Sequence, residues 1–174
     1  MLRPIQASDA EPLYQLIKDK AIAQFVALPQ PYRRKDMTEF LRKTAKTRKE
    51  GSYYLFAIRL YNRPEPIGAI DIHGLGPKSS SCSLGFWLGK PYWNQGIMTQ
   101  AVKLVIQFCF DRLKLHRVNI THSEGNDGSR RVIEKCWFRR EGMSREAMLL
   151  HGKWHDVVNY GLLEQEYRQI RDRS

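Results

Sequence analysis

The sequence has 174 residues, of which 42% are hydrophobic and 11% aromatic, values typical of a folded globular chain. Its length allows one domain with a substantial core and argues against two. The 29 Lys and Arg residues against 18 Asp and Glu residues give a formal net charge of +11. Such a charge favours a polyanionic ligand or partner, such as a phosphorylated compound, RNA or an acidic protein surface, without choosing among them.

Neither a membrane segment nor a metal site is expected. No apolar run approaches the roughly 18 residues that span a bilayer, and the N-terminal stretch lacks the apolar core of a secretory signal, so we predict a cytoplasmic protein with no membrane partner. The three cysteines form no Cys-x-x-Cys pair, which argues against zinc. Cys109 and Cys136 fall on apolar helical positions and are expected in the core.

In chain order, the first half of the sequence predicts a short strand, two helices and three strands. Apolar spacing typical of an amphipathic helix occurs over Ala7–Lys20 and again over Asp36–Lys49. Aromatic and branched residues then predict strands, the first two joined as a hairpin by the Pro-containing turn at 62–66. These strands cover Tyr53–Leu60, Ile67–Ile72 and Leu84–Leu88.

The second half predicts helices alternating with strands, then a final hairpin turning at His151-Gly152. The polar tail Glu164–Ser174 is expected to fray. This order predicts one α/β domain over residues 1–174 with a mixed sheet, in which only the segment 84–122 forms a parallel crossover. The predicted elements are helices over Ile97–Leu113 and Asp127–Cys136 and strands over Arg117–His122, Phe138–Leu150 and Lys153–Leu163.

The helix predicted over Asp36–Lys49 is strongly basic outside a narrow apolar stripe. Two interpretations stay open: the helix presents a solvated face, or it offers an electrostatic surface to an acidic partner or RNA. Its positive residues, with those just before it, are Arg33, Arg34, Lys35, Arg42, Lys43, Lys46, Arg48 and Lys49.

The stretch Leu84–Thr99, LGFWLGKPYWNQGIMT, is the most informative part of the chain. A strand passes through a turn containing Gly96 into the helix that begins at Ile97. The first N–H groups of a helix have no internal partner, and the helix dipole favours an anion there. The stretch therefore predicts a phosphate-binding turn, and a second informative block, Asn126–Phe138, follows it.

Together these blocks resemble the GNAT superfamily of acyl-CoA-dependent N-acetyltransferases. Within it they resemble the RimJ/RimL-type group, whose namesakes acetylate N-terminal amines of ribosomal proteins. The resemblance covers nearly the whole chain through several degenerate motifs in the family's order. They are Leu2-Arg-Pro4, Gly85-Phe-Trp-Leu-Gly89, Pro91-Tyr-Trp93, Gly96-Ile-Met-Thr-Gln-Ala101, Leu115-His-Arg-Val118, Asn126-x-x-Ser129-x-Arg131-Val132-x-Glu134-Lys135-x-x-Phe138, Glu141-Gly142 and Gly152-Lys-Trp154-His-Asp156.

The resemblance implies a twisted, mostly antiparallel sheet of about seven strands with a central splayed parallel pair, flanked by about four helices. It implies acetyl-CoA as cosubstrate. The pantetheine arm is expected in the wedge between the parallel strands, and the diphosphate at backbone N–H groups from Gln95 to Thr99. The implied cofactor-binding residues are Phe86, Trp87, Leu88, Asn94, Gln95, Gly96, Ile97, Met98, Thr99, Asn126, Ser129 and Arg131.

Three departures from the family pattern fall in the diphosphate loop. Trp93 stands where the loop usually begins with Gln or Arg, Asn94 where Gly is frequent, and Met98 where Gly or Ala is usual. Trp137 also replaces a usual Gly. Because the loop's contacts come from the backbone, these changes are compatible with binding, although the bulky Met98 is expected to narrow or shift the loop.

Acetyl transfer needs a neutral amine, a polarised thioester carbonyl and a stabilised leaving thiolate. The resemblance assigns the carbonyl to a main-chain N–H in Phe86–Leu88. Many family members protonate the thiolate with a Tyr, but that position holds Ile133. The RimL-like pattern instead points to Ser129 as donor to the thiolate, with Asn126 orienting cofactor or water. The alternative role for both is helix capping.

The general base is the least defined part of the predicted site. RimL-like members use a Glu on the strand matching Phe138–Leu150, and the aligned position holds Met148. Our candidate is Glu146, since residues two apart share a face of a strand. Further candidates are Glu124, His122 and His73.

The free-energy cost of deprotonating the acceptor amine indicates which class of acceptor the site favours. An α-amino group titrates near about 7.7–8.0 and a Lys side chain near about 10.4, a difference of roughly 3.5 kcal/mol. A site without a strong base therefore favours a protein or peptide N-terminus, with the ribosome as a possible partner of the basic 33–49 helix. Two alternatives remain: a small amine (drug, polyamine or amino acid) as acceptor, favoured by an acidic cluster at its entrance, and a catalytically idle CoA- or RNA-binding domain. An oligomer is compatible with the sequence.

Overall fold

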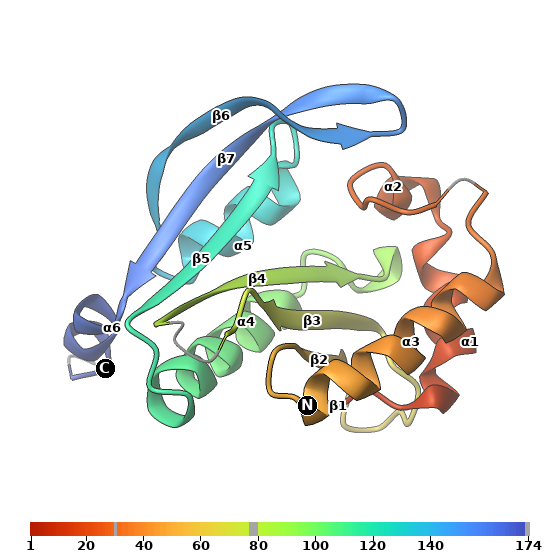
Figure 1. Cartoon of the computed structure of the whole chain (residues 1–174), viewed down its shortest axis with the longest axis horizontal. Helices are drawn as coiled ribbons and strands as arrows, with labels where there is room; N and C mark the ends of the chain where they lie inside the picture. Colours follow the sequence, from red (N-terminus) through yellow and green to blue (C-terminus); the bar gives the residue numbers. More distant parts are fainter. Residues whose placement is uncertain (30, 77–79, 173–174) are drawn as a thin grey trace.

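The computed structural model describes residues 1–29, 31–76 and 80–172 and contains one seven-stranded sheet (Figure 1). The strand order is β1-β2-β3-β4-β5-β7-β6. Only β4 and β5 are parallel, which confirms the mixed, mostly antiparallel sheet with a central parallel pair. The strands are β1 (Leu2–Pro4), β2 (Tyr54–Ile58), β3 (Gly68–His73), β4 (Ser81–Leu88), β5 (Arg117–Ser123), β6 (Arg139–Leu150) and β7 (Lys153–Leu163).

Helices cover both faces of the sheet. The main core joins α4 and α5 to one face through residues such as Val102, Ile120 and Ile133. A smaller core joins α1 and α3 to the other face, where Leu13 and Leu41 pack with Leu55 of β2. The helices are α1 (Ala10–Ile17), α2 (Lys20–Ala23), α3 (Arg34–Lys49), α4 (Ile97–Gln107), extended by a π-helical turn (Phe108–Arg112), α5 (Asp127–Lys135) and α6 (Glu164–Arg171).

The parallel pair opens partway along its length. Pairing between β4 and β5 runs from Ser81 opposite Arg117 to Leu84 opposite Ile120 and then stops. Both strands continue, β4 to Leu88 and β5 to Ser123, and their ribbons diverge (Figure 1). Past Leu84, the facing main-chain edges therefore lack a neighbouring strand, which is the predicted splay.

The two sides of this opening meet again at its far end. The turn of the β6–β7 hairpin reaches across toward α2 (Figure 1). Nε2 of His151, in that turn, lies 2.8 Å from the carbonyl oxygen of Ala23. His151 and Gly152 both have left-handed backbone angles (φ 50° and 77°), as the predicted two-residue turn requires.

The structure differs from the predicted elements at both ends of the chain. The helix expected over Ala7–Lys20 ends at Ile17, and α2 follows as a separate turn capped by Asp19, whose side chain accepts from the Ala21 N–H. The tail expected to fray forms α6. It is held by the carboxylate of Glu166, which accepts the Leu163 N–H, and by Tyr167, whose ring stacks on Phe110 at 5.0 Å.

Asp9 ties the first strand to the first helix. Its carboxylate is almost fully buried and accepts two hydrogen bonds from the Arg3 guanidinium, at 2.7 and 2.5 Å. It also accepts the Gln6 N–H at 2.8 Å. A paired geometry of this kind compensates the cost of removing the carboxylate from water.

We expect Asp9→Ala to lower the free energy of unfolding by about 3 kcal/mol, because it leaves a guanidinium and an N–H without their acceptor. Urea unfolding followed by circular dichroism measures this loss. The matched control is Glu39→Ala, which breaks an exposed, solvent-screened ion pair with Lys43 and should leave the free energy of unfolding nearly unchanged. Equal unfolding midpoints for the two variants would contradict the role of Asp9.

Candidate active site

A cleft of about 950 Å³ occupies the opening between β4 and β5. It is lined by β4, the loop leading to α4, the end of β5, the first turns of α5 and the segment around α2. All twelve residues predicted to bind cofactor lie along its wall. They come from three separate stretches of sequence (86–88, 94–99 and 126–131), which the splay brings together.

The loop before α4 has the geometry of an anion site. Gly96 precedes the first turn with a left-handed φ of 76°, and the helix starts without a side-chain cap. The first intrahelical hydrogen bond runs from the Gln100 N–H to the Gly96 carbonyl oxygen. The N–H groups of the residues between them therefore have no acceptor within the helix. A Cβ at Gly96 would meet no atom within 4 Å, since it would point into open space.

Two side chains hold this loop in place. The indole N–H of Trp93 donates to the Leu88 carbonyl oxygen at 2.7 Å, and the amide of Gln95 donates to the Pro91 carbonyl oxygen at 3.0 Å. Asn94 has φ 59°, a left-handed angle that Asn tolerates better than most residues other than Gly. The departures at Trp93 and Asn94 therefore fit the loop's backbone.

Met98 does not crowd the loop. Its side chain is 6% exposed and belongs to the main core cluster, so Met98 lines the cleft while most of its bulk lies in the core. Trp137 also keeps a left-handed angle (φ 68°), the conformation that Gly adopts readily after a helix. Lys103 lies 4.3 Å from the centre of its ring, a cation–π contact that stabilises this arrangement.

The first turn of α5 places both predicted polar residues at the cleft. Asn126 caps the helix, because its side-chain oxygen accepts the Ser129 N–H at 3.1 Å. Ser129 is partly buried and lines the cleft. Arg131 and Lys135 are exposed and line the same wall, which they make positive. Ile133 is fully buried in the core, so it contributes no polar group.

Glu146 is not brought to the cleft. The β6–β7 pairing shifts register between Ser144 and Met148, and Glu146 lies in this bulge with φ 48°. A bulge interrupts the alternation of faces on which our expectation depended. Met148 lines the cleft, whereas Glu146 and Glu124 are exposed and absent from its described lining.

The two candidate histidines both line the cleft but differ in their contacts. His122 is 7% exposed, with Nδ1 2.9 Å from the Ser123 carbonyl oxygen and Nε2 3.5 Å from the Tyr160 hydroxyl. His73 is 46% exposed, and its Nδ1 lies 2.6 Å from Oδ1 of Asp71. This hydrogen bond raises the pKa of His73, against the opposing effect of burial.

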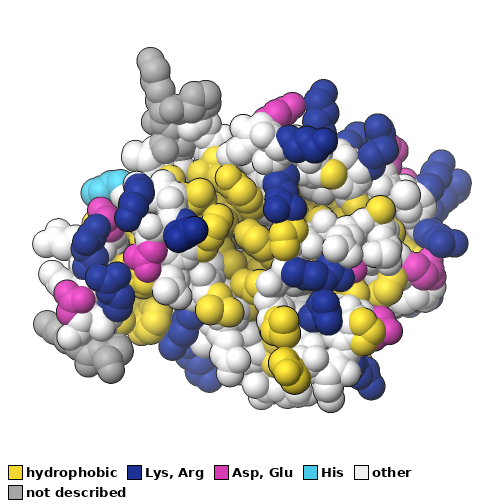
Figure 2. All heavy atoms as spheres, turned by 90° about the horizontal axis from the view of Figure 1, so that it is seen from below, with side chains coloured by type: hydrophobic (Ala, Val, Ile, Leu, Met, Phe, Trp, Pro, Cys, Tyr) yellow, Lys and Arg dark blue, Asp and Glu magenta, His cyan; other side chains and the backbone are white. Residues whose placement is uncertain are grey.

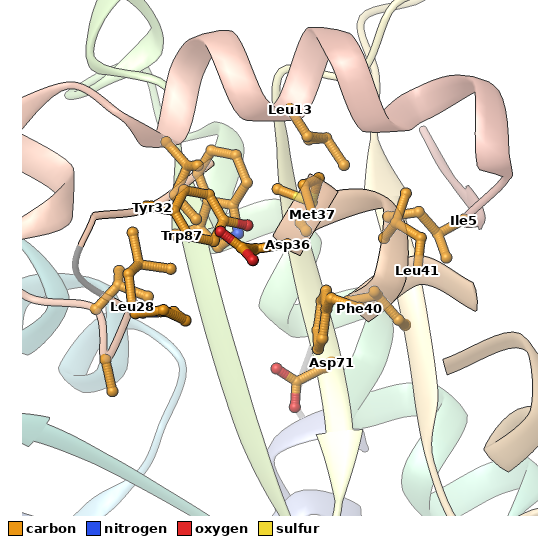
Figure 3. A pocket seen from close by; sticks show the side chains of 16 residues that line it. Ile5, Leu13, Leu28, Tyr32, Asp36, Met37, Phe40, Leu41, Asp71 and Trp87 are labelled. Atoms are coloured by element: carbon orange, nitrogen blue, oxygen red, sulfur yellow. The ribbon is translucent and has the colours of Figure 1, made fainter. Parts of the chain in front are cut away.

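Sequence reasoning missed Asp71 and the second cavity that it borders. This cavity, of about 310 Å³, lies between α1, α3 and the sheet and is mostly apolar (Figure 3). Val26, Ala27, Asp71 and Trp87 line both the cavity and the cleft. The spacing of Asp71 and His73 on a predicted strand is the signal that could have indicated a shared face.

The positive charge is not confined to the basic helix. Figure 2 shows Lys and Arg side chains around much of one face, with a hydrophobic area between them. Part of the charge on α3 is paired, since Arg34 contacts Glu11 at 2.7 Å and Lys43 contacts Glu39 at 3.0 Å.

The described residues contain neither a candidate metal site nor a membrane-spanning helix. No group of three His, Cys, Asp or Glu side chains within them could hold a metal ion. Within the same ranges, no helix is long and apolar enough to cross a membrane. The three cysteines are free and buried, as expected for Cys109 and Cys136, and Sγ of Cys82 lies 3.8 Å from Sγ of Cys109.

Comparison with known proteins agrees with this architecture. The family described as Acetyltransferase (GNAT) domain matches residues 1–139, so the chain belongs to the GNAT acetyltransferase family. Its reaction class is therefore N-acetyl transfer. The chain is 31% identical over 137 residues to the probable N-acetyltransferase YjcK of Bacillus subtilis (strain 168), which covers 78% of this chain and 74% of that protein.

Other relatives are named for ribosomal proteins. The ribosomal-protein-serine acetyltransferase of Escherichia coli (strain K12) is 28% identical over 165 residues, covering 91% of this chain and 89% of that enzyme. YdaF of Bacillus subtilis (strain 168) is 36% identical over 100 residues, which span 58% of this chain and only 55% of YdaF. The structure of RimL, a ribosomal L7/L12 alpha-N-protein acetyltransferase in complex with coenzyme A, aligns with a TM-score of 0.86 at 25% identity, covering 95% and 94% of the two chains.

Proposed function

We propose that this protein transfers the acetyl group of acetyl-CoA to the α-amino group of a protein or peptide N-terminus. The observation that carries the proposal is the cleft at the splay of β4 and β5, with a capless helix start at one end. The residues present fit the cofactor. The positive wall from Arg131 and Lys135 and the N–H groups at the start of α4 suit its phosphates.

The strand edges suit the rest of acetyl-CoA. Its pantetheine arm contains amides, which can pair with the main chain of β4 beyond Leu84, where β5 has moved away. This placement would bring the thioester near Phe86–Leu88, where a main-chain N–H can polarise its carbonyl. Ser129 faces the same cleft from α5 and is our candidate donor to the leaving thiolate, with Asn126 beside it.

The acceptor is expected to approach from the side of Asp71, Trp87 and α2. The cavity that adjoins the cleft there is lined by apolar side chains, and its polar groups are largely engaged: Asp36 accepts the Arg33 N–H at 2.7 Å. Burial, together with Asp36, raises the pKa of Tyr32 to about 12, so its hydroxyl stays neutral. This surface suits an amine attached to an apolar group.

A small cationic amine is a second candidate acceptor. Asp36 and Asp71 both line the cavity, so the entrance is locally acidic in a protein that is basic overall. This is the feature that a polyamine or cationic drug would need. The names of the relatives favour the N-terminal acceptor, and the assay below separates the two candidates.

Gly96 is expected to determine how tightly the loop before α4 binds the diphosphate of CoA. Gly96→Val should raise the dissociation constant of CoA at least about tenfold, because a β-branched residue disfavours the left-handed angle and fills the space facing the helix start. Isothermal titration with CoA measures the effect. Gly152→Val is the control, since it imposes the same backbone strain (φ 77°) in a hairpin turn outside the cleft. Equal affinities for the two variants would show that the loop is misassigned.

The proposed acceptor determines which amines should stimulate the reaction. Thiol release from acetyl-CoA should be stimulated by peptides with a free N-terminus far more than by N-blocked peptides carrying Lys, because the α-amine is deprotonated at lower cost. Polyamines and aminoglycosides form the comparison panel. Ser129→Ala should lower kcat by a larger factor than it weakens CoA binding. If no amine stimulates release although CoA binds, the chain is an idle binding domain and the proposal fails.

A further inference from the structure

We propose that His73 is the general base that takes the proton from the acceptor amine, with Asp71 as its positioning residue. The inference rests on the acetyl transfer proposed above and supplies the proton acceptor that β6 does not provide. It follows from the placement of this pair on β3, beside the part of β4 that has left β5.

The pair lies on one face of β3, opposite two small residues of β4. Asp71 is in register with Gly85, and His73 with Ser83. All four residues line the cleft. Because pairing with β5 ends at Leu84, the pair lies where the splay begins, next to the strand expected to hold the thioester.

Gly85 makes room for the carboxylate. A Cβ at this position would come within 2.6 Å of Oδ2 of Asp71, so any larger residue would displace that side chain. The backbone of Gly85 does not require Gly for its conformation, since its φ lies outside the left-handed region. In this structure, the absence of a side chain at Gly85 therefore leaves space for Asp71.

The hydrogen bond leaves one ring nitrogen for substrate. With Nδ1–H donating to Asp71, Nε2 of the neutral ring carries the lone pair. Within the described part of the chain, Nε2 has no hydrogen-bond partner, and the side chain is 46% exposed at the cleft. A carboxylate that fixes an imidazole in this way sets its tautomer and stabilises the imidazolium that forms. His122 is buried with both nitrogens near protein groups, so it is poorly suited to this task.

The charges around the pair suit proton uptake from an α-amine. The hydrogen bond to Asp71 raises the pKa of His73 from its ordinary value, toward that of an α-amino group. Tyr53, beside Asp71, stays neutral because burial raises its pKa. The remaining titratable residues that line the cleft are Tyr92, His122, Asp127, Arg131 and Lys135.

In the proposed reaction, two protons leave the acceptor nitrogen while a C–N bond forms and a C–S bond breaks. The acceptor ammonium gives one proton to Nε2 of His73, and the neutral nitrogen attacks the thioester carbon to form a C–N bond. The tetrahedral intermediate expels CoA thiolate as the C–S bond breaks. The second proton of the nitrogen passes to the thiolate through the Ser129 hydroxyl, which donates one proton to sulfur and takes up the one from nitrogen, so that Ser129 ends unchanged. His73 then returns its proton to solvent.

The test measures kcat for His73→Gln at saturating peptide and acetyl-CoA. We expect a fall of at least about 100-fold, the usual size of general-base catalysis, with CoA affinity unchanged by titration calorimetry. Imidazole in the buffer should restore part of the activity of His73→Ala. His116→Gln, an exposed histidine outside the described cleft lining, is the matched control and should stay within about threefold of the parent.

The pH dependence of kcat tests whether Asp71 positions His73 for catalysis or only supports the fold. In the parent, kcat should rise with pH as His73 loses its proton. Asp71→Asn removes the charge that raises this pKa, so the rising limb should move to lower pH while kcat falls. If His73→Gln keeps kcat within about threefold and keeps the limb, the inference is wrong although acetyl transfer stands. If the parent releases no thiol with any amine, the proposed function fails instead.

Discussion

The loss of pairing between β4 and β5 is the constraint on which the site depends. Main-chain donors and acceptors that lack partners carry a free-energy cost unless water or a ligand satisfies them. The chain maintains these open edges because the strands lead to different elements, β4 to the loop before α4 and β5 to the turn before α5. Trp93 satisfies the carbonyl of Leu88, the last residue of β4. The remaining edge is available to a ligand rich in amides.

Backbone conformation accounts for the sequence's departures from its family. Asn94 and Trp137 stand where Gly is usual, yet both take left-handed angles of the kind Gly adopts readily. Trp137 is the more strained of the two, because a bulky residue rarely takes a positive φ. The cation–π contact between its ring and Lys103 offsets part of this cost. Met98 replaces a small residue but directs its bulk into the core. Backbone conformation is therefore a better guide to this loop than the identity of its side chains.

Periodicity predicted the seven strands and the parallel crossover because these depend on the local alternation of apolar residues. It failed where a local rule was broken by distant contacts. The tail forms α6 because Tyr167 has Phe110 to stack on, and that partner lies far away in the sequence. Glu146 misses the cleft because a register shift in β6 breaks the alternation of faces. Asp71 and His73 are visible as a spaced pair, but their role depends on register with Gly85 and Ser83 of another strand.

The contact between His151 and Ala23 has a consequence for the shape of the acceptor. It joins the tip of the β6–β7 hairpin to the end of α2, so the splayed strands are bridged at their far end. The hairpin tip and α2 therefore lie together at one end of the opening. For the N-terminal acceptor proposed above, this arrangement favours a free chain end, because a lysine within a folded loop would bring two segments of polypeptide to the same entrance.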